Sequence, residues 1–152
     1  MKKLILILLF VNIFAVTFDI DKISSQAQKQ NKKLLIFFHM DYCGYCEKML
    51  KNNFKNNDIL NKITKDYIYI DVNISDDDII VYKNFKGTQS EFARKYKIYF
   101  FPTTIFLQDD KVIYKVKGYR NSEKFAYILK YIKSDEYKHK QLEEFILDQE
   151  MM

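Results

Sequence analysis

Hydrophobic residues recur along this chain with two spacings, one typical of strands and one typical of helices. Residues 67–73 alternate apolar positions with polar or amphipathic ones, which predicts a strand. Residues 34–39 form a largely apolar run, the pattern of a buried strand. Two more apolar segments, 103–107 and 112–116, predict strands that are joined by a tight hairpin turn at 108–111.

Helical spacing predicts the segments between these strands. A short leading helix is expected over residues 21–32, and a second helix over residues 45–53. Asp58 and Ser122 are expected to act as N-caps of two further helices. The stretch Thr88–Glu91 has the Thr-x-x-Glu pattern of a capping box, which predicts a helix start there.

Two segments fit this scheme less simply. Residues 75–87 begin with acidic residues and are predicted to be a loop, although residues 79–82 form an apolar patch within it. Near the C-terminus, Leu142, Phe145 and Ile146 lie on one face of a helical pattern. This last helix is either a packed extension of the domain or a tail that binds a partner.

The order of the elements predicts the fold class. Two strands joined through a helix are most simply parallel, and the hairpin adds antiparallel pairing. We therefore expect an α/β fold with a mixed sheet of four or five strands, helices on both faces and an extra C-terminal helix. With 152 residues and 48% apolar content, the chain suits one domain with a proper core.

The first fifteen residues have the pattern of an export signal. Lys2 and Lys3 precede an apolar run, and Ala15 suits the last position before a cleavage site. The alternative is an uncleaved anchor, but the apolar stretch 4–18 is shorter than the roughly 20 residues that span a bilayer core. The expected organisation is a signal peptide or anchor over residues 1–15 and one domain over residues 16–152.

The charge pattern argues against a nucleic-acid partner. The formal net charge of +5 falls to +3 without residues 1–15, because that segment holds two lysines and no acid. The remaining lysines are interspersed with acids, as on an ordinary solvated surface, whereas nucleic-acid binding needs a clustered basic face.

The only two cysteines, Cys43 and Cys46, stand between a predicted strand and a predicted helix. Backbone N–H groups at a helix start and the helix dipole favour the thiolate of the first cysteine. In an oxidising compartment two cysteines usually form a structural disulfide, but a bridge across two residues closes almost no loop. The spacing therefore favours thiol–disulfide exchange over an inert bridge.

The chain resembles members of the thioredoxin superfamily, and among them the exported SoxW-like proteins. The matching segments are 34–38, 42–46, 67–72, 91–96, 101–104 and 118–119. The resemblance implies a thioredoxin-like fold for residues 16–152 and a periplasmic location. It also implies a thiol–disulfide oxidoreductase that mainly reduces disulfides of other proteins.

The resemblance assigns roles to single residues. Cys43 matches the attacking thiol, and Cys46 matches the resolving thiol that releases the reduced product. Tyr42 stands where many members have an aromatic residue beside the site. The dipeptide Gly44-Tyr45 is that of a periplasmic disulfide isomerase; it lacks the His of the strongest oxidants and the Pro of ordinary thioredoxin.

Two further positions follow from the resemblance. Pro102, the only proline, matches a cis-proline that faces the cysteines, while the alternative is a trans proline that starts an edge strand. Phe101 would then offer its main chain to a bound peptide. Phe37 stands where thioredoxin buries a carboxylate, so water or another group must deprotonate Cys46. The residues expected to bind substrate are Tyr42, Gly44, Tyr45, Phe101 and Pro102.

Metal and cofactor binding are not expected. His39, four residues before Cys43, could tune the thiolate or join the two cysteines and the distant His139 around a metal, but a packed aromatic-like role is favoured because that ligand set is incomplete. The three glycines form no GxGxxG run.

The partners expected are proteins that contain disulfides and a membrane thiol–disulfide electron donor, and the chain is expected to be a monomer. Two alternatives stay open. The protein could act as a disulfide isomerase or oxidase. It could also be a non-catalytic peptide-binding module that grips its partner through the surface around Tyr42, Tyr45 and Phe101 while the disulfide stays shut.

Overall fold

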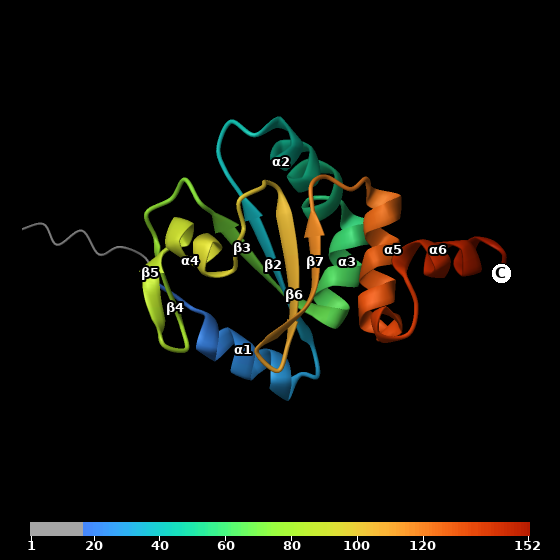
Figure 1. Ribbon diagram of the computed structural model, residues 1–152, viewed down its shortest axis with the longest axis horizontal. Helices are drawn as coiled ribbons and strands as arrows, with labels where there is room; N and C mark the ends of the chain where they lie inside the picture. Colours follow the sequence, from blue (N-terminus) through green and yellow to red (C-terminus); the bar gives the residue numbers. More distant parts are fainter. Residues whose placement is uncertain (1–16) are drawn as a thin grey trace, which may run out of the picture.

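The central sheet has four strands in the order β3-β2-β6-β7, in a computed structural model that describes residues 17–152 (Figure 1). β2 (Lys33–His39) pairs in parallel with β3 (Tyr67–Asn73). On its other side β2 pairs antiparallel with β6 (Thr103–Gln108), and β7 (Lys111–Lys117) closes the sheet as an antiparallel edge. The predicted mixed four-stranded sheet is confirmed, while the predicted signal segment 1–15 lies outside the described residues.

Helices cover both faces of this sheet (Figure 1). Helices α2 (Gly44–Met49), α3 (Asn57–Asp66) and α5 (Ser122–Lys133) pack on one face, and α1 (Ile20–Lys29) and α4 (Gln89–Lys95) pack on the other. The apolar run of β2 follows from this arrangement, because both of its faces are covered. Its alternate side chains enter two separate cores: Leu35 and Phe37 on the α2 face, and Leu34, Ile36 and Phe38 on the α1 face.

A second sheet replaces the loop that the sequence predicted over residues 75–87. β1 (Thr17–Asp19) pairs in parallel with β4 (Ile79–Tyr82), which pairs antiparallel with β5 (Phe85–Thr88). Ile80 and Tyr82 are each only 1% exposed and join the core of the α1 face. The apolar patch 79–82 is therefore a strand, because burying it requires its backbone groups to pair.

The helix starts differ from prediction at four places, one of them α2, which begins at Gly44 instead of residue 45 and is followed by a π-helical turn at Leu50–Phe54. Asn56, not Asp58, caps α3. Its side chain accepts hydrogen bonds from the backbone N–H groups of Asp58 and Ile59. Asn121, not Ser122, caps α5, and its side chain accepts a hydrogen bond from the backbone N–H of Lys124. α1 begins at Ile20, one residue before the predicted start, because Asp19 caps it. The predicted capping box at Thr88 is confirmed.

The C-terminal segment packs against the domain. A short 3-10 helix (Glu136–Lys138) leads into α6 (Leu142–Glu150), whose Leu142 and Phe145 are buried in the core beside α5. The alternative of a packed extension is therefore the correct one for this helix. Within residues 17–152, no helix is both long enough and apolar enough to cross a membrane.

Candidate active site

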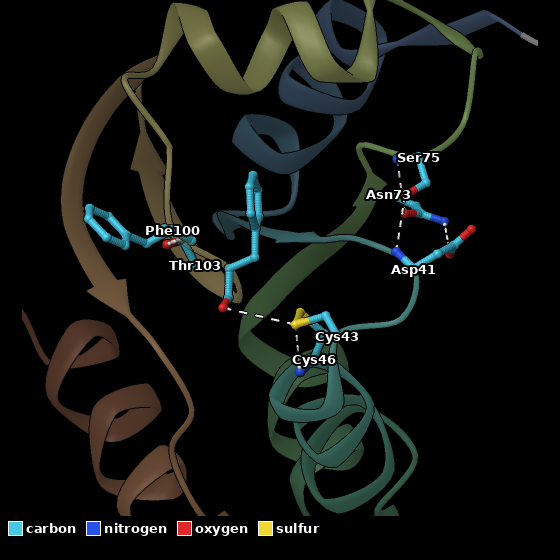
Figure 2. Close-up of a disulfide and its surroundings, with 8 residues drawn as sticks. Asp41, Cys43, Cys46, Asn73, Ser75, Phe100 and Thr103 are labelled. Carbon is cyan, nitrogen blue, oxygen red and sulfur yellow. Dashed lines mark hydrogen bonds between the residues drawn. A yellow bond between two sulfur atoms is a disulfide. The ribbon is translucent and has the colours of Figure 1, made fainter.

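The two cysteines form a disulfide where β2 leads into α2 (Figure 2). Cys43 has extended backbone and caps the helix, and its Sγ accepts a hydrogen bond of 3.2 Å from the backbone N–H of Cys46. The same N–H would stabilise a thiolate on Cys43 after reduction. The sequence places the first sulfur at a helix start, and the structure confirms that position.

Exposure separates the two sulfurs. Cys43 is half-buried, whereas Cys46 is 1% exposed. Gly44, between them, has open space around it, since no atom outside its own neighbours would lie within 4 Å of a Cβ at this position. Cys43 can therefore be reached from solution, whereas Cys46 is buried.

Phe101 and Pro102 lie beside the accessible sulfur. The Phe101–Pro102 peptide bond is cis, and the carbonyl oxygen of Phe101 lies 4.0 Å from Sγ of Cys43. Thr103 holds this turn because its hydroxyl donates a 2.7 Å hydrogen bond to the carbonyl of Phe100. Phe101 was expected near the site, and it lies there with its main-chain carbonyl beside Sγ of Cys43.

The aromatic surface around the site differs in part from expectation. The Phe101 side chain is half-buried and packs against the core of the α1 face. Tyr42 is fully exposed, and Tyr45 is 64% exposed and stacks on Tyr119 with a centroid distance of 6.3 Å. Phe100, which precedes Phe101, is 68% exposed and was not singled out from the sequence.

The sequence matches the thioredoxin-like domain family over residues 20–133, which is most of the chain. The chain belongs to this family. A thioredoxin-fold protein from Helicobacter pylori is 27% identical with a TM-score of 0.62, and the match covers 78% of this chain and 79% of that one.

Two other solved structures share the fold of this thioredoxin-like protein. A thioredoxin from Thermus thermophilus is 17% identical with a TM-score of 0.59, over 78% of this chain and 86% of that one. A DsbH oxidoreductase is 16% identical with a TM-score of 0.57, over 92% of this chain and 96% of that one. No curated protein matches the chain significantly.

The core between the sheet and α2 of this thioredoxin-like protein contains aromatic rings. Phe37 is fully buried, its ring is tilted against that of Phe54 with centroids 4.4 Å apart, and it stacks on the His39 ring at 5.2 Å. Next to it, His39 is 8% exposed, and its Nε2 lies 3.0 Å from Oδ1 of Asp71. The packed position expected for His39 is confirmed, and Asp71 is a neighbour that the sequence did not indicate.

The two histidines of the thioredoxin-like protein belong to opposite ends of the sheet. His39 ends β2, whereas His139 follows the segment whose Asp135 contacts Lys33 at the start of β2. Within residues 17–152, no group of three or more His, Cys, Asp or Glu side chains has the spacing of a metal site. The set of four ligands considered from the sequence is therefore not brought together.

Three hydrogen bonds hold the two ends of the cysteine segment. Before it, Asn73 donates a 3.0 Å hydrogen bond to the Asp41 carboxylate, and the Asp41 N–H donates to the Ser75 hydroxyl at 3.0 Å (Figure 2). After it, the chain makes a π-helical turn at Leu50–Phe54, where the buried Asn53 side chain donates to the Arg120 carbonyl at 2.8 Å. Sequence spacing gave no signal for these contacts, because each joins distant segments.

Proposed function

We propose that this protein is an exported thiol–disulfide oxidoreductase that mainly reduces the disulfides of other proteins. The observation that carries this proposal is the unequal exposure of the cysteine pair at a helix start, half-buried for Cys43 and 1% exposed for Cys46. Such a pair can present one sulfur to a substrate and keep the other in reserve. An inert structural bridge would gain little from so short a loop.

Reduction would proceed in two exchange steps. The Cys43 thiolate attacks one sulfur of a substrate disulfide, and the other substrate sulfur leaves as a thiolate that takes a proton. Cys46 then loses its proton and attacks Sγ of Cys43. The Cys43–Cys46 disulfide forms, and the second substrate thiol is released. Two electrons pass to the substrate in total.

The substrate would bind as an extended segment over the accessible sulfur. The Phe101 carbonyl, 4.0 Å from Cys43 Sγ, offers a main-chain acceptor beside the reacting atom. The exposed rings of Tyr42 and Tyr45 offer apolar area on the helix side. Gly44 and Pro102 complete the proposed binding residues, Gly44 by leaving the space above the disulfide open and Pro102 by shaping the turn beside it.

Location and partners rest on the sequence. The pattern of residues 1–15 and the likeness to SoxW-like proteins support a periplasmic location, with the segment either cleaved or kept as an anchor. The oxidised pair must regain two electrons and two protons after each turnover. A membrane thiol–disulfide donor is the proposed source, and the chain is proposed to work as a monomer.

A trapping experiment tests the exchange chemistry. In Cys46→Ser, Cys43 should accumulate mixed disulfides with substrate proteins, which run as reducible adducts on gels; Cys43→Ser, the matched control, should form none. A non-catalytic peptide-binding module would form no adduct in either variant. If Cys46→Ser fails to fold because Cys46 is buried, Cys46→Ala gives the same readout.

The reduction potential of the pair tests the direction. The dipeptide Gly44-Tyr45 lacks the His of strong oxidants, which supports reduction. A midpoint potential near that of thioredoxin, about −270 mV, agrees with a reductase, while a value toward about −120 mV would mean an oxidase. An intermediate value with recovery of scrambled ribonuclease would identify an isomerase.

A further inference from the structure

His39 is a buried titratable side chain with an incomplete set of hydrogen bonds. Its Nε2 lies 3.0 Å from Oδ1 of Asp71, but the contact lacks hydrogen-bond geometry, and no partner within residues 17–152 satisfies this buried nitrogen. Buried polar atoms are nearly always paired, so an unpaired one needs an explanation. A group that takes up and returns a proton at this nitrogen is one such explanation.

Strand and helix geometry lead us to expect His39 and Cys46 at the same end of the α2 face. His39 and Phe37 point to the same face of β2, and their rings stack at 5.2 Å. Phe37 shares the core of that face with Met49 of α2. From Phe37 to His39 the strand advances about 7 Å toward its end, and from Met49 back to Cys46 the helix advances about 4.5 Å toward its start. Since α2 starts where β2 ends, both steps lead to the same end of the same face.

The elements packed around His39 carry several other titratable groups. On α2, Tyr45, Glu47 and Lys48 are exposed and in water. On β3, Tyr67 lies at the far end, and burial followed by the nearby Asp71 charge raises the pKa of Tyr69, which donates a 3.0 Å hydrogen bond to Asp71. Asp41, in the next loop, accepts from Asn73.

The second exchange step, in which Cys46 attacks Sγ of Cys43, needs a group that accepts the Cys46 proton. Cys46 is 1% exposed, so water has little access to its proton, and Phe37 offers no carboxylate. An imidazole is the side chain best suited to take and return a proton near neutral pH. A carboxylate beside it balances the charge that it gains, as Asp71 would for His39.

We propose that His39, oriented by Asp71, takes the proton of Cys46 when Cys46 attacks the mixed disulfide. The proton leaves Cys46 Sγ for the imidazole, the new Cys43–Cys46 bond forms, and the bond from Cys43 to the substrate sulfur breaks. The imidazolium then gives its proton to the departing substrate thiolate or to solvent. His39 is thus assigned the role of proton acceptor for Cys46. This inference rests on the proposed function.

A two-phase reaction with Ellman's reagent tests this role. The reduced protein should release one thionitrobenzoate when Cys43 attacks and a second when Cys46 resolves the adduct. In His39→Gln, we expect the second phase to slow about tenfold or more at pH 7, and its rise with pH to move toward the ordinary thiol range near about 8.5. The first phase should change less than about twofold, since Cys43 keeps its helix N–H contact.

Two more variants make the test specific. Asp71→Asn should slow the second phase in the same direction by a smaller factor, and it decides the matter if His39→Gln does not fold, because the Asp71 side chain is half exposed. His139→Gln, which changes the other histidine at the far end of the sheet, should leave both phases unchanged.

The outcomes separate the two proposals. A second phase in His39→Gln and Asp71→Asn within about twofold of wild type, with an unchanged pH profile, would overturn the role of His39 and leave the exchange chemistry standing. The absence of any first phase in the wild-type protein would instead overturn the proposed function, and the role of His39 with it.

Discussion

The carbonyl oxygen of Phe101 lies 4.0 Å from Sγ of Cys43, although the two residues are 58 positions apart in the sequence. Strand pairing explains this proximity. β2 and β6 are antiparallel neighbours with Phe38 opposite Thr103, so the end of one strand meets the start of the other. A substrate sulfur bonded to Cys43 would therefore lie against the main chain of Phe101.

Tyr42 should matter for protein substrates and not for small ones. Its ring is fully exposed beside Cys43, so it can contact only a partner. Tyr42→Ala should raise KM for a protein disulfide about fivefold, the equivalent of losing about 1 kcal/mol of aromatic contact. The rate with a small aromatic disulfide reagent should stay within about twofold of wild type. An equal loss with both substrates would contradict a binding role. Tyr127→Ala, on α5, is the control.

The packing of α6 should contribute to global stability. Phe145 is 4% exposed and lies 5.3 Å from the ring of Tyr131, whereas Leu147 on the same helix is 58% exposed. Phe145→Ala should lower the free energy of unfolding by about 3–5 kcal/mol, and Leu147→Ala by less than about 0.5 kcal/mol. Urea unfolding followed by circular dichroism measures both. Equal, small effects would mean that α6 is a loosely attached tail.

The cap of α3 can be tested by a pair of substitutions. The Asn56 side chain accepts backbone hydrogen bonds of 3.0 and 3.3 Å, while Asp58 only contributes a negative charge to the first turn. Asn56→Ala should cost about 1 kcal/mol of unfolding free energy, and Asp58→Ala a few tenths. Thermal or urea unfolding would reveal the reverse order if Asp58 were the cap.

The Asp110 carboxylate should make stability depend on pH. A 2.7 Å hydrogen bond from the Ser24 hydroxyl lowers the pKa of Asp110, and Tyr82 and Lys83 lower it further while burial opposes them. A carboxyl whose pKa is lower in the folded state stabilises it above the unfolded pKa, about 3.9, and this contribution is lost as the pH falls through the folded pKa.

Asp110→Asn should therefore destabilise the protein by on the order of 1 kcal/mol at pH 7, and the difference from wild type should shrink below about pH 4. Asp109→Asn, at the exposed neighbouring turn position, should have little effect at either pH. A difference for Asp110→Asn that is the same at pH 3 and pH 7 would contradict the ionised role of this carboxyl.

The central sheet could be predicted because its patterns are local. β3 has the predicted bounds, and β2 and the hairpin strands agree within one residue at each end. The second sheet could not be predicted in the same way. β1 contributes only three residues, and the burial of Ile80 and Tyr82 depends on pairing with β1 and β5. The caps Asn56 and Asn121 were missed because each stands beside another good capping residue.

The site was predictable where spacing alone defines it. Two cysteines at a strand-to-helix junction indicated the reactive pair, and the Phe101–Pro102 turn followed from family resemblance. The contacts of His39 with Asp71, and of Asp41 with Asn73, come from the pairing of β2 with β3. Sequence spacing carries no information on which residues such a pairing sets side by side.

The pH dependence of alkylation of the reduced protein tests most directly whether Cys43 is an accessible thiolate. Iodoacetamide labelling followed by peptide mass spectrometry reports each cysteine separately. We expect Cys43 to react with an apparent pKa well below about 8.5, the ordinary thiol value, and Cys46 to stay unlabelled in the folded protein. If Cys43 reacts no faster than Cys46, or only with the pKa of a free thiol, the proposed chemistry is wrong.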